Sequence, residues 1–387
     1  MSWPVTGMGA VASVGRTVDE IYAGLCAGHS GIGPLRAFNR DWYRGGDLFE
    51  VDDRPADGVD VPGRASALLL DAVDQAVTDA GLGERLDDVP VLVGTGLREL
   101  RSVELWWRDG VPLGPGGLHF GTVLRERFGT VDTHTFANAC SASLYALAMG
   151  VDLLELDLAD TVIVAGVDVV TESMFGLADR VQPEPPGQVR PFDRHRRGTI
   201  LGEGAAAIVL RRDATTRYGN VLDIGVNCDA YHPTAPALGS VAAAMRDAHR
   251  RAGVKPEDID LVMLHGTGTP LNDEVEASAL VEVYGDDVSR VLMTGVKSLT
   301  GHTSGASGMI NLIVALRAMR EGLVPPISGL DDPFDEAARF NFARSDAVRA
   351  EIALAQIDGF GFGGINAVAI VEAAEPWPAG AHHGAWA

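Results

Sequence analysis

The chain has 387 residues, of which 46% are hydrophobic and 22% charged, so it can bury one large core or two fused cores of ordinary domain size. Its formal charge of −22 disfavours nucleic acid or an anionic membrane surface as the main partner. No run reaches the roughly 20 apolar residues of a membrane span, and the N-terminus lacks the basic start of a signal peptide. Three widely spaced cysteines favour a reducing compartment, so a cytoplasmic location is expected.

Apolar runs separated by turn residues predict an α/β chain in which strands and helices alternate. The first run, over 5–11, ends in a glycine turn, and Pro4 before it favours a short strand or a sheet edge. The segment 38–63 is expected to be irregular surface chain, and 97–120 a helix with a cover loop. Further strands are expected over 89–93, 162–170, 205–210, 261–264, 291–294, 353–357 and 367–371, and helices over 17–27 and 65–80.

A cysteine stands at the start of a long apolar stretch in the first half. Residues 136–156 read F-A-N-A-C-S-A-S-L-Y-A-L-A-M-G-V-D-L-L-E-L, with small residues around Cys140 and a helix buried on every side from Leu144. The positive end of that helix is expected to lower the pKa of the thiol. A free cysteine packed as a small hydrophobe is the simpler interpretation. The segment 304–319 repeats this design, which predicts a duplicated fold with two central helices.

Three motifs downstream add polar residues of catalytic type. His265 lies in L-H-G-T-G-T-P at a strand end, and Lys297 and His302 lie in V-K-S-L-T-G-H-T-S-G-A-S-G before the second buried helix. The glycines of G-F-G-F-G-G-I-N-A, over 359–367, let the backbone approach a ligand closely. Taken alone, a histidine is more often a surface or core residue, and these glycines do not form the G-x-x-x-x-G-K-[ST] phosphate loop.

Taken together, and in order along nearly the whole chain, these motifs resemble the β-ketoacyl-acyl carrier protein synthase family, the type I/II condensing enzymes. The resemblance implies an α/β, thiolase-like fold with duplicated βαβαβαββ halves in five α/β/α/β/α layers. An N-terminal half over 1–215 would carry the cysteine, and a C-terminal half over 216–372 the histidines and the lysine. A disordered tail is expected over 373–387.

The resemblance also implies roles for individual residues around the reaction. Cys140 is the expected nucleophile, and His265 and His302 are the expected pair of histidines. Lys297 matches the lysine that accompanies them, and Glu276 matches the acid that pairs with this lysine.

Residues of the C-terminal motif and its neighbours are expected to support these five. Phe362 would gate the acyl pocket, and its backbone N–H would form the oxyanion hole with that of Cys140. Phe360 and Asn366 belong to the same motif. Substrate-binding roles are expected for Thr267 and Thr269 (on the phosphopantetheine arm) and for Asn138, and carrier-protein docking roles for Arg194, Arg196 and Arg197.

By this resemblance the chain is a ketosynthase that joins a Cys140-bound acyl group to a malonyl-type thioester with loss of CO2, in fatty acid or polyketide biosynthesis. Acyl carrier protein is the expected partner, together with a second copy of the chain or a chain-length-factor subunit, and neither nucleic acid nor a membrane is expected. No metal or redox cofactor is expected. Three alternatives are an acyltransferase that uses a non-malonyl nucleophile, an idle partner that shapes the pocket of another subunit, and a binding protein for acyl thioesters.

The sequence departs from the family pattern at a few places beside the expected site. Asn138 stands where the family commonly has Thr, Ile365 replaces the usual Thr of G-G-T-N, and Asp358 and Gly359 replace the usual Asn-Ser. Only about 44 residues separate Gly96 from Cys140, which is shorter than the resemblance leads us to expect. Because this stretch normally helps to form the dimer interface and the acyl-pocket floor, its length bears on chain-length preference and on dimer geometry.

Overall fold

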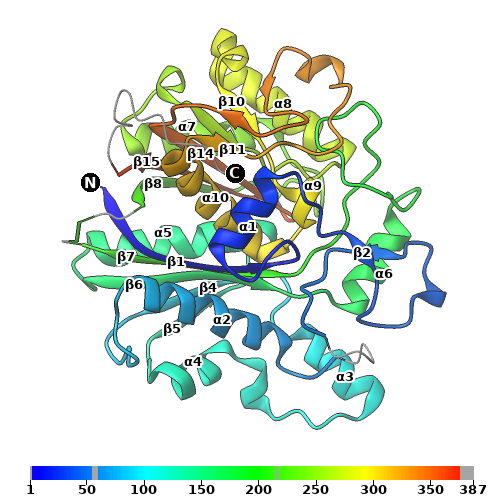
Figure 1. Cartoon of the computed structure of the whole chain (residues 1–387), viewed down its shortest axis with the longest axis vertical. Helices are drawn as coiled ribbons and strands as arrows, with labels where there is room; N and C mark the ends of the chain where they lie inside the picture. The colour runs from blue at the N-terminus through cyan, green and yellow to red at the C-terminus, as the bar shows by residue number, and fades with distance from the viewer. Residues whose placement is uncertain (1, 55–59, 213, 216–217, 375–387) are drawn as a thin grey trace, which may run out of the picture.

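The computed structural model describes residues 2–54, 60–212, 214–215 and 218–374. Within them, one 11-stranded sheet runs through the molecule in the order β12-β10-β9-β14-β15-β8-β1-β7-β6-β4-β5 (Figure 1). The prediction for the tail over 373–387 falls almost wholly outside the described residues. None of the described helices combines the length and the apolar character that a membrane span requires.

The sheet contains the same topology twice, which confirms the predicted duplication. In the first repeat β5 and β6 both pair in parallel with β4, β6 is antiparallel to β7, and β7 is antiparallel to β1. In the second repeat β10 and β14 both pair in parallel with β9, β14 is antiparallel to β15, and β15 is antiparallel to β8. The two repeats join where β1 pairs with β8 over three residues.

The strands of the two repeats are three to ten residues long and apolar at most positions, as buried strands require. In the first repeat they are β1 (Trp3–Ala12), β4 (Val91–Gly94), β5 (Thr133–Phe136), β6 (Thr161–Asp168) and β7 (Gly204–Arg211). In the second repeat they are β8 (Gly219–Cys228), β9 (Leu261–Met263), β10 (Leu292–Thr294), β14 (Leu354–Gly361) and β15 (Ile365–Ala373). The short strands are β2 (Gly33–Pro34), β3 (Asp47–Leu48), β11 (Leu323–Val324), β12 (Asn341–Phe342) and β13 (Val348–Arg349).

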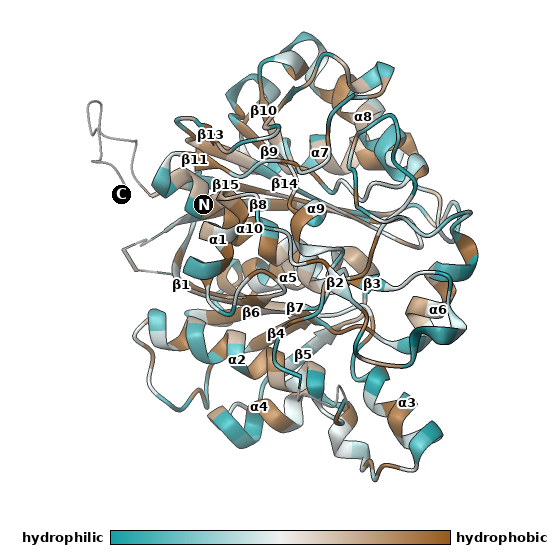
Figure 2. Ribbon diagram, turned by 45° about the vertical axis from the view of Figure 1, so that its right-hand side comes forward, coloured by the Kyte–Doolittle hydropathy of each residue, from teal (hydrophilic) through white to brown (hydrophobic). Residues whose placement is uncertain are grey.

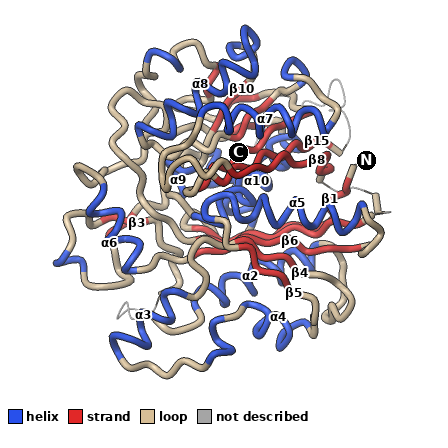
Figure 3. The backbone as a smooth tube through the Cα atoms, turned by 180° about the vertical axis from the view of Figure 1, so that it is seen from behind, coloured by secondary structure: helices blue, strands red, loops and turns tan. Residues whose placement is uncertain are grey.

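Helices lie on both faces of each repeat and complete the five layers (Figures 1 and 3). The central layer holds α5 (Ala142–Glu155) and α10 (Ser307–Glu321), which are packed so tightly that a Cβ on Gly308 would lie 2.7 Å from Leu144. The outer layers are α2 (Arg64–Asp79) and α4 (Phe120–Phe128) on one side, and α7 (Leu238–Ala252) and α8 (Pro270–Tyr284) on the other. The remaining helices are α1 (Val18–Cys26), α3 (Leu100–Asp109), α6 (Glu172–Val181) and α9 (Lys297–Thr300).

The structure corrects one prediction about the first strand. β1 is ten residues long and lies between β7 and β8 in the middle of the sheet, so it is neither short nor at the edge. Pro4 is tolerated because pairing with β7 begins only at Val5, so that residue 4 has a neighbouring strand on one side only. The missing N–H of proline therefore breaks no ladder on the β7 side.

Candidate active site

The cysteine lies in a tight turn between β5 and the central helix α5. The turn is the 3₁₀ segment Ala139–Ser141, and Ala139 adopts a left-handed φ of 50°, an uncommon conformation for a residue with a Cβ. The Ser141 hydroxyl donates to the carbonyl of Ile365 over 2.5 Å, which ties this turn to the C-terminal glycine motif. The turn that carries Cys140 is therefore tied to a distant part of the chain, as expected for a site rather than for a loosely packed core cysteine.

His302 comes from the second repeat and meets the sulfur directly. Its Nε2 lies 3.0 Å from Cys140 Sγ. The backbone N–H of His302 donates to the carbonyl of Ile200 over 2.8 Å, and the carbonyl of His302 accepts from the N–H of Gly202 over 3.0 Å. Two backbone hydrogen bonds on one residue fix the direction of the imidazole. The structure thus brings the predicted nucleophile and the predicted second histidine into contact.

His265 stands beside His302, and its backbone is held by two of the predicted residues. The two imidazole rings lie 5.6 Å apart at 85°, and the His265 ring also lies 5.6 Å from that of Phe360. The carboxylate of Glu276 accepts from the backbone N–H of His265 over 2.6 Å, and the Lys297 ammonium donates to the His265 carbonyl. Both imidazoles leave Nδ1 buried without a partner, so Nε2 is the nitrogen of His302 that faces the sulfur.

The predicted ion pair between Glu276 and Lys297 is not formed, although both residues belong to the described part of the chain: they make no contact within the 4.0 Å that defines an ion pair. The oxygens of Glu276 are occupied by the N–H groups of His265 and Gly266 and by the amide of Asn272. Lys297 and Glu276 therefore act on opposite ends of the same residue, His265.

Burial sets the protonation states of the two histidines and of Lys297. Burial holds the pKa values of both His265 and His302 well below the ordinary value, and the charge of Lys297 acts in the same direction. Both imidazole rings are therefore neutral at physiological pH. Burial also lowers the pKa of Lys297 to about 8, partly offset by the negative charge of Glu276. Lys297 is consequently the cation of the site, and each neutral imidazole has one N–H to donate.

The sequence-based expectation of a lowered thiol pKa is wrong for the resting protein. Burial raises the pKa of Cys140 to about 11, although Lys297 and two backbone N–H groups favour the thiolate. The cost of removing a thiolate from water outweighs the partial charge of one helix end. The two N–H groups are those of Phe362 and of Cys140 itself, which are the groups predicted to form the oxyanion hole.

The remaining residues of the C-terminal motif lie around the same point. Phe362 is 51% exposed, whereas Phe360 is buried against His265. The amide of Asn366 is buried and donates to Asn227 over 3.0 Å and to the Gly364 carbonyl over 3.1 Å. Asn366 thus holds the shape of the glycine turn and does not contact the sulfur.

The predicted substrate-binding residues divide into two groups. The hydroxyls of Thr267 and Thr269 share a 2.8 Å hydrogen bond in the loop that follows His265. Asn138 directly precedes the nucleophile turn and is half-buried, and its side chain makes no cap on that turn.

The three arginines predicted to dock a carrier protein already have carboxylate partners. Arg194 contacts Asp332 over 3.0 Å and Asp335 over 2.6 Å, and Arg196 contacts Glu274 over 2.7 Å. Arg197 pairs with Glu184. The positive charge of this segment is therefore largely neutralised within the chain.

Sequence reasoning missed Asp168, a buried carboxylate at the end of β6. It accepts from the hydroxyl of Thr95 and from the backbone N–H groups of Gly96, Leu97 and Gly305 over 2.6–2.8 Å. Gly305 belongs to the second repeat and lies three residues after His302, so Asp168 joins the two repeats beside the nucleophile. A polar residue directly after the apolar run over 162–167 is the signal that could have identified it.

Comparisons with known proteins agree with this geometry. The model for the beta-ketoacyl synthase N-terminal domain matches residues 130–216, and that for the C-terminal domain matches 218–331. The chain is 27% identical to 3-oxoacyl-[acyl-carrier-protein] synthase 2 of Coxiella burnetii, over 95% of this chain and 97% of the relative. It is 29% identical to nodulation protein E of Rhizobium meliloti, over 94% and 97%.

Solved structures share the architecture over almost the full length. The structure described as the ishigamide ketosynthase/chain length factor superposes with a TM-score of 0.87 at 31% identity, covering 96% of this chain and 99% of the other. A type II polyketide synthase acyl-carrier protein in complex with its ketosynthase, described as AntDE:AntF, superposes with a TM-score of 0.83 at 20% identity, covering 96% and 99%. The second likeness bears on the fold alone.

Proposed function

The chain belongs to the beta-ketoacyl synthase family, and on that premise we propose that it is a ketosynthase that extends an acyl group by decarboxylative Claisen condensation. One observation carries the proposal. Two neutral imidazoles lie next to each other at a cysteine sulfur, with Nε2 of His302 at 3.0 Å from the sulfur and the His265 ring at 5.6 Å from the His302 ring, and both are held by backbone contacts. This arrangement suits a reaction in which a nucleophile and a developing enolate need separate hydrogen-bond donors.

In the first step Cys140 takes the acyl group from a thioester. Because the thiol is neutral at rest, Nε2 of His302 accepts its proton as the sulfur attacks the acyl carbon. The backbone N–H groups of Cys140 and Phe362 stabilise the oxyanion of the tetrahedral intermediate. The carrier thiolate then leaves with the proton, and the acyl group stays on Cys140 as a new thioester.

In the second step a malonyl-type thioester loses CO2, and the electrons of the broken C–C bond pass to its carbonyl as an enolate. An N–H of His265 stabilises that oxygen, and His302 does the same once its single proton has exchanged through solvent from Nδ1 to Nε2, the nitrogen that faces the sulfur. Lys297 orients His265 through its carbonyl. The enolate carbon attacks the acyl-cysteine, a C–C bond forms, and the Cys140 thiolate leaves and regains a proton. No oxidation state changes overall, so this scheme needs no redox cofactor, and the proposal assigns none.

Intact-mass measurement with an acyl-carrier protein tests the proposal. We expect the protein to gain the mass of the acyl group and the Cys140→Ala variant to gain none. Release of CO2 from labelled malonyl-carrier protein then separates a ketosynthase from an acyltransferase that uses another nucleophile. An adduct that persists in Cys140→Ala, or complete absence of an adduct, would refute the assignment.

The same data address the other two alternatives. A protein that only binds acyl thioesters would retain ligand without covalent mass gain. An idle partner subunit would stay unacylated until mixed with a second chain. The contact between His302 and Cys140 favours a working nucleophile over both.

Two partners and a location complete the proposal. Acyl carrier protein would deliver both substrates on phosphopantetheine, with Thr267 and Thr269 lining the approach of the arm. A second ketosynthase-like chain, either a copy or a chain-length factor, would pair along β5, which is the last strand of the described sheet. Cys26, Cys140 and Cys228 are free thiols, in keeping with the proposed cytoplasmic location.

A further inference from the structure

Two surface helices begin at the same edge of the sheet as the nucleophile. β4, β5 and β6 are parallel neighbours, so their carboxyl ends share one edge. The chain leaves β5 into the Cys140 turn, β4 into α3 and β6 into α6. Asp168, at the end of β6, accepts hydrogen bonds from Gly96 after β4 and from Gly305, which lies three residues after His302. A partner resting on α3 and α6 would therefore lie beside the nucleophile.

Large apolar side chains are exposed on these helices and on the loop next to them. Trp107 of α3 is 81% exposed, Val181 of α6 is 69% exposed, and Trp42 is 74% exposed. Tyr43, the neighbour of Trp42, packs edge-to-face on Phe175 of α6, and Arg101 of α3 contacts Glu172 of α6, so the three elements adjoin. Figure 2 shows hydrophobic residues on α3 and α6 at the right-hand side, and Figure 3 shows the same two helices together from behind. Exposed aromatic clusters of this kind mark interaction sites.

Three arginines on the same elements lack ion-pair partners among the described residues. Arg40 precedes Trp42 by two residues, Arg98 lies just before α3, and Arg180 lies within α6, and all three are exposed. This contrasts with the paired arginines at 194–197. Arg98 also has a left-handed φ of 53°, a strained conformation that is found preferentially at functional positions. Free guanidinium groups beside apolar side chains favour an acidic partner with an apolar face.

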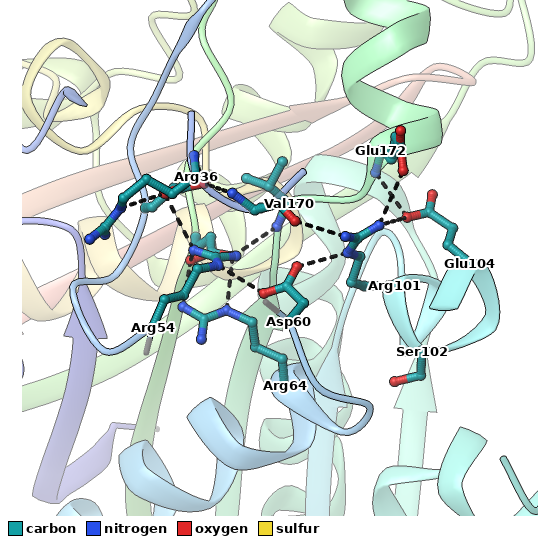
Figure 4. Close-up of polar contacts among 12 residues, drawn as sticks. Arg36, Arg54, Asp60, Arg64, Arg101, Ser102, Glu104, Val170 and Glu172 are labelled. Atoms are coloured by element: carbon teal, nitrogen blue, oxygen red, sulfur yellow. Dashed lines mark hydrogen bonds and ion pairs between the residues drawn. The ribbon is translucent and has the colours of Figure 1, made fainter. Parts of the chain in front are cut away.

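A buried ion network holds the helices in place (Figure 4). The guanidinium of Arg101, in α3, contacts Asp60 over 2.8 Å, Glu104 over 3.0 Å and Glu172 of α6 over 3.4 Å. It also donates to the carbonyl of Ala37 over 2.9 Å. α3, α6 and the loop before Trp42 thus share one anchor. A surface fixed in advance loses little conformational entropy on binding.

We propose that the α3–α6 surface, made of Arg40, Trp42, Arg98, Trp107, Arg180 and Val181, docks the acyl carrier protein through an acidic helix with an apolar face. The inference rests on the proposed function and deepens it, because it places the partner on residues other than Arg194, Arg196 and Arg197. Charge complementarity and closeness to the nucleophile select this occupant over a second copy of the chain, which is itself strongly acidic.

Charge reversal tests the proposal. The pair Arg98→Glu and Arg180→Glu is compared with the matched pair Arg344→Glu and Arg349→Glu, which changes two exposed arginines elsewhere that form no ion pair with any described residue. Acylation of the protein is followed by intact mass, with the acyl group delivered either on carrier protein or on free pantetheine. We expect the test pair to raise the KM for acyl-carrier protein at least about tenfold at low salt, and less at high salt. The matched pair should change it less than about twofold.

Acylation by the free pantetheine substrate shows whether a negative result refutes the docking surface or the proposed function. If the test pair leaves the KM for carrier protein unchanged while pantetheine acylates it normally, the docking surface is wrong and the proposed function stands. If pantetheine acylation is also lost in the folded test pair, Arg98 and Arg180 serve the site itself, and the docking inference is again wrong. If the unaltered protein is never acylated by either substrate, the proposed function fails and takes the inference with it.

The oligomeric state shows whether a second copy of the chain, rather than a carrier protein, covers the α3–α6 surface. Native mass spectrometry of the full chain is compared with that of Trp107→Ala. We expect the same oligomer for both. Dissociation of the variant into monomers would show that α3 belongs to an interface between chains, and this result would overturn the proposal.

Discussion

Glu203 should contribute several kcal/mol to stability, because it is a fully buried carboxylate clamped by two arginines. Glu203 lies directly before β7. Its carboxylate oxygens accept hydrogen bonds from the guanidinium groups of Arg54 and Arg64, over 2.7 Å and 2.8 Å, and from the backbone N–H of Val51 over 3.0 Å. In Glu203→Gln an amide NH2 would face these donors, and each of the two buried guanidinium groups would lose one carboxylate partner, although Arg54 keeps Asp60 and Arg64 keeps Asp53. Breaking a buried ion pair from one side costs about 3–5 kcal/mol.

The pH dependence gives a second, independent magnitude. Burial alone would raise the pKa of Glu203, but Arg54 and Arg64 outweigh it and hold the pKa at about 2, against an ordinary value of 4.5. A carboxyl with a depressed folded pKa stabilises the fold fully above pH 4.5, and that stabilisation is lost as the pH falls towards 2. The difference corresponds to about 3 kcal/mol, of which about 2 kcal/mol is already lost at pH 3.

Reversible urea unfolding followed by tryptophan fluorescence measures both effects. At pH 7 we expect Glu203→Gln to lower the free energy of unfolding by about 3–5 kcal/mol. At pH 3 the difference in unfolding free energy between the unaltered protein and Glu203→Gln should be smaller by about 2 kcal/mol. Glu184→Gln is the matched control, since its partner Arg197 is 67% exposed and such a surface pair contributes less than about 1 kcal/mol. A loss below about 1 kcal/mol in Glu203→Gln, or a gap that does not change with pH, would contradict the reasoning.

Three further predictions concern the site. The rate of Cys140 alkylation by iodoacetamide should rise about tenfold per pH unit from pH 7 to 9, because the thiol pKa is about 11, and a plateau below pH 8 would show a thiolate at rest. Lys297→Met should slow the alkylation of Cys140 about three- to tenfold at pH 8, because the charge of Lys297 favours the thiolate. An unchanged rate would show that Lys297 does not influence the pKa of Cys140. Asp358→Asn should change the acylation rate at pH 7 less than about threefold. The reason is that one oxygen of Asp358 accepts only from Gln356 and the other is buried without a partner, as in a neutral acid. A loss of acylation rate above about tenfold would indicate that Asp358 is ionised.

The elements that apolar runs predicted are those buried on both faces. β6 and β7 are continuous buried strands, and the runs over 162–170 and 205–210 located them within two residues. β5 escaped prediction because its four residues, T-H-T-F, are partly exposed and mixed in polarity. β8 escaped prediction because buried, half-buried and exposed positions alternate irregularly along it. Local sequence gives no signal when strand pairing, rather than burial, decides the structure.

The site divides in the same way between local and long-range information. The sequence motifs located Cys140, His265 and His302, whose neighbours fix the shape of each turn. The hydrogen-bond partner of Lys297 could not be predicted from the sequence. The carboxylate of Glu276 accepts from the backbone N–H of His265, and the Lys297 ammonium donates to the carbonyl of the same residue. The thiol pKa could not be predicted either, since desolvation comes from residues of both repeats.

The duplicated topology explains why the two turns at the centre differ in chemistry. The turns Ala139–Ser141 and Ser304–Ala306 occupy equivalent places before α5 and α10, and each contains a residue with a left-handed φ, Ala139 at 50° and Ser304 at 46°. The first turn presents the sulfur of Cys140, whereas the second has Gly305 at the equivalent position and is preceded by His302. In the proposed function, one repeat therefore supplies the group that is acylated, and the other supplies the group that accepts its proton. Asp168 of the first repeat binds the second turn, and Ser141 of the first turn binds the glycine motif of the second repeat. A shift of either repeat would therefore separate His302 from Cys140 and stop the proposed reaction before the acyl group is bound.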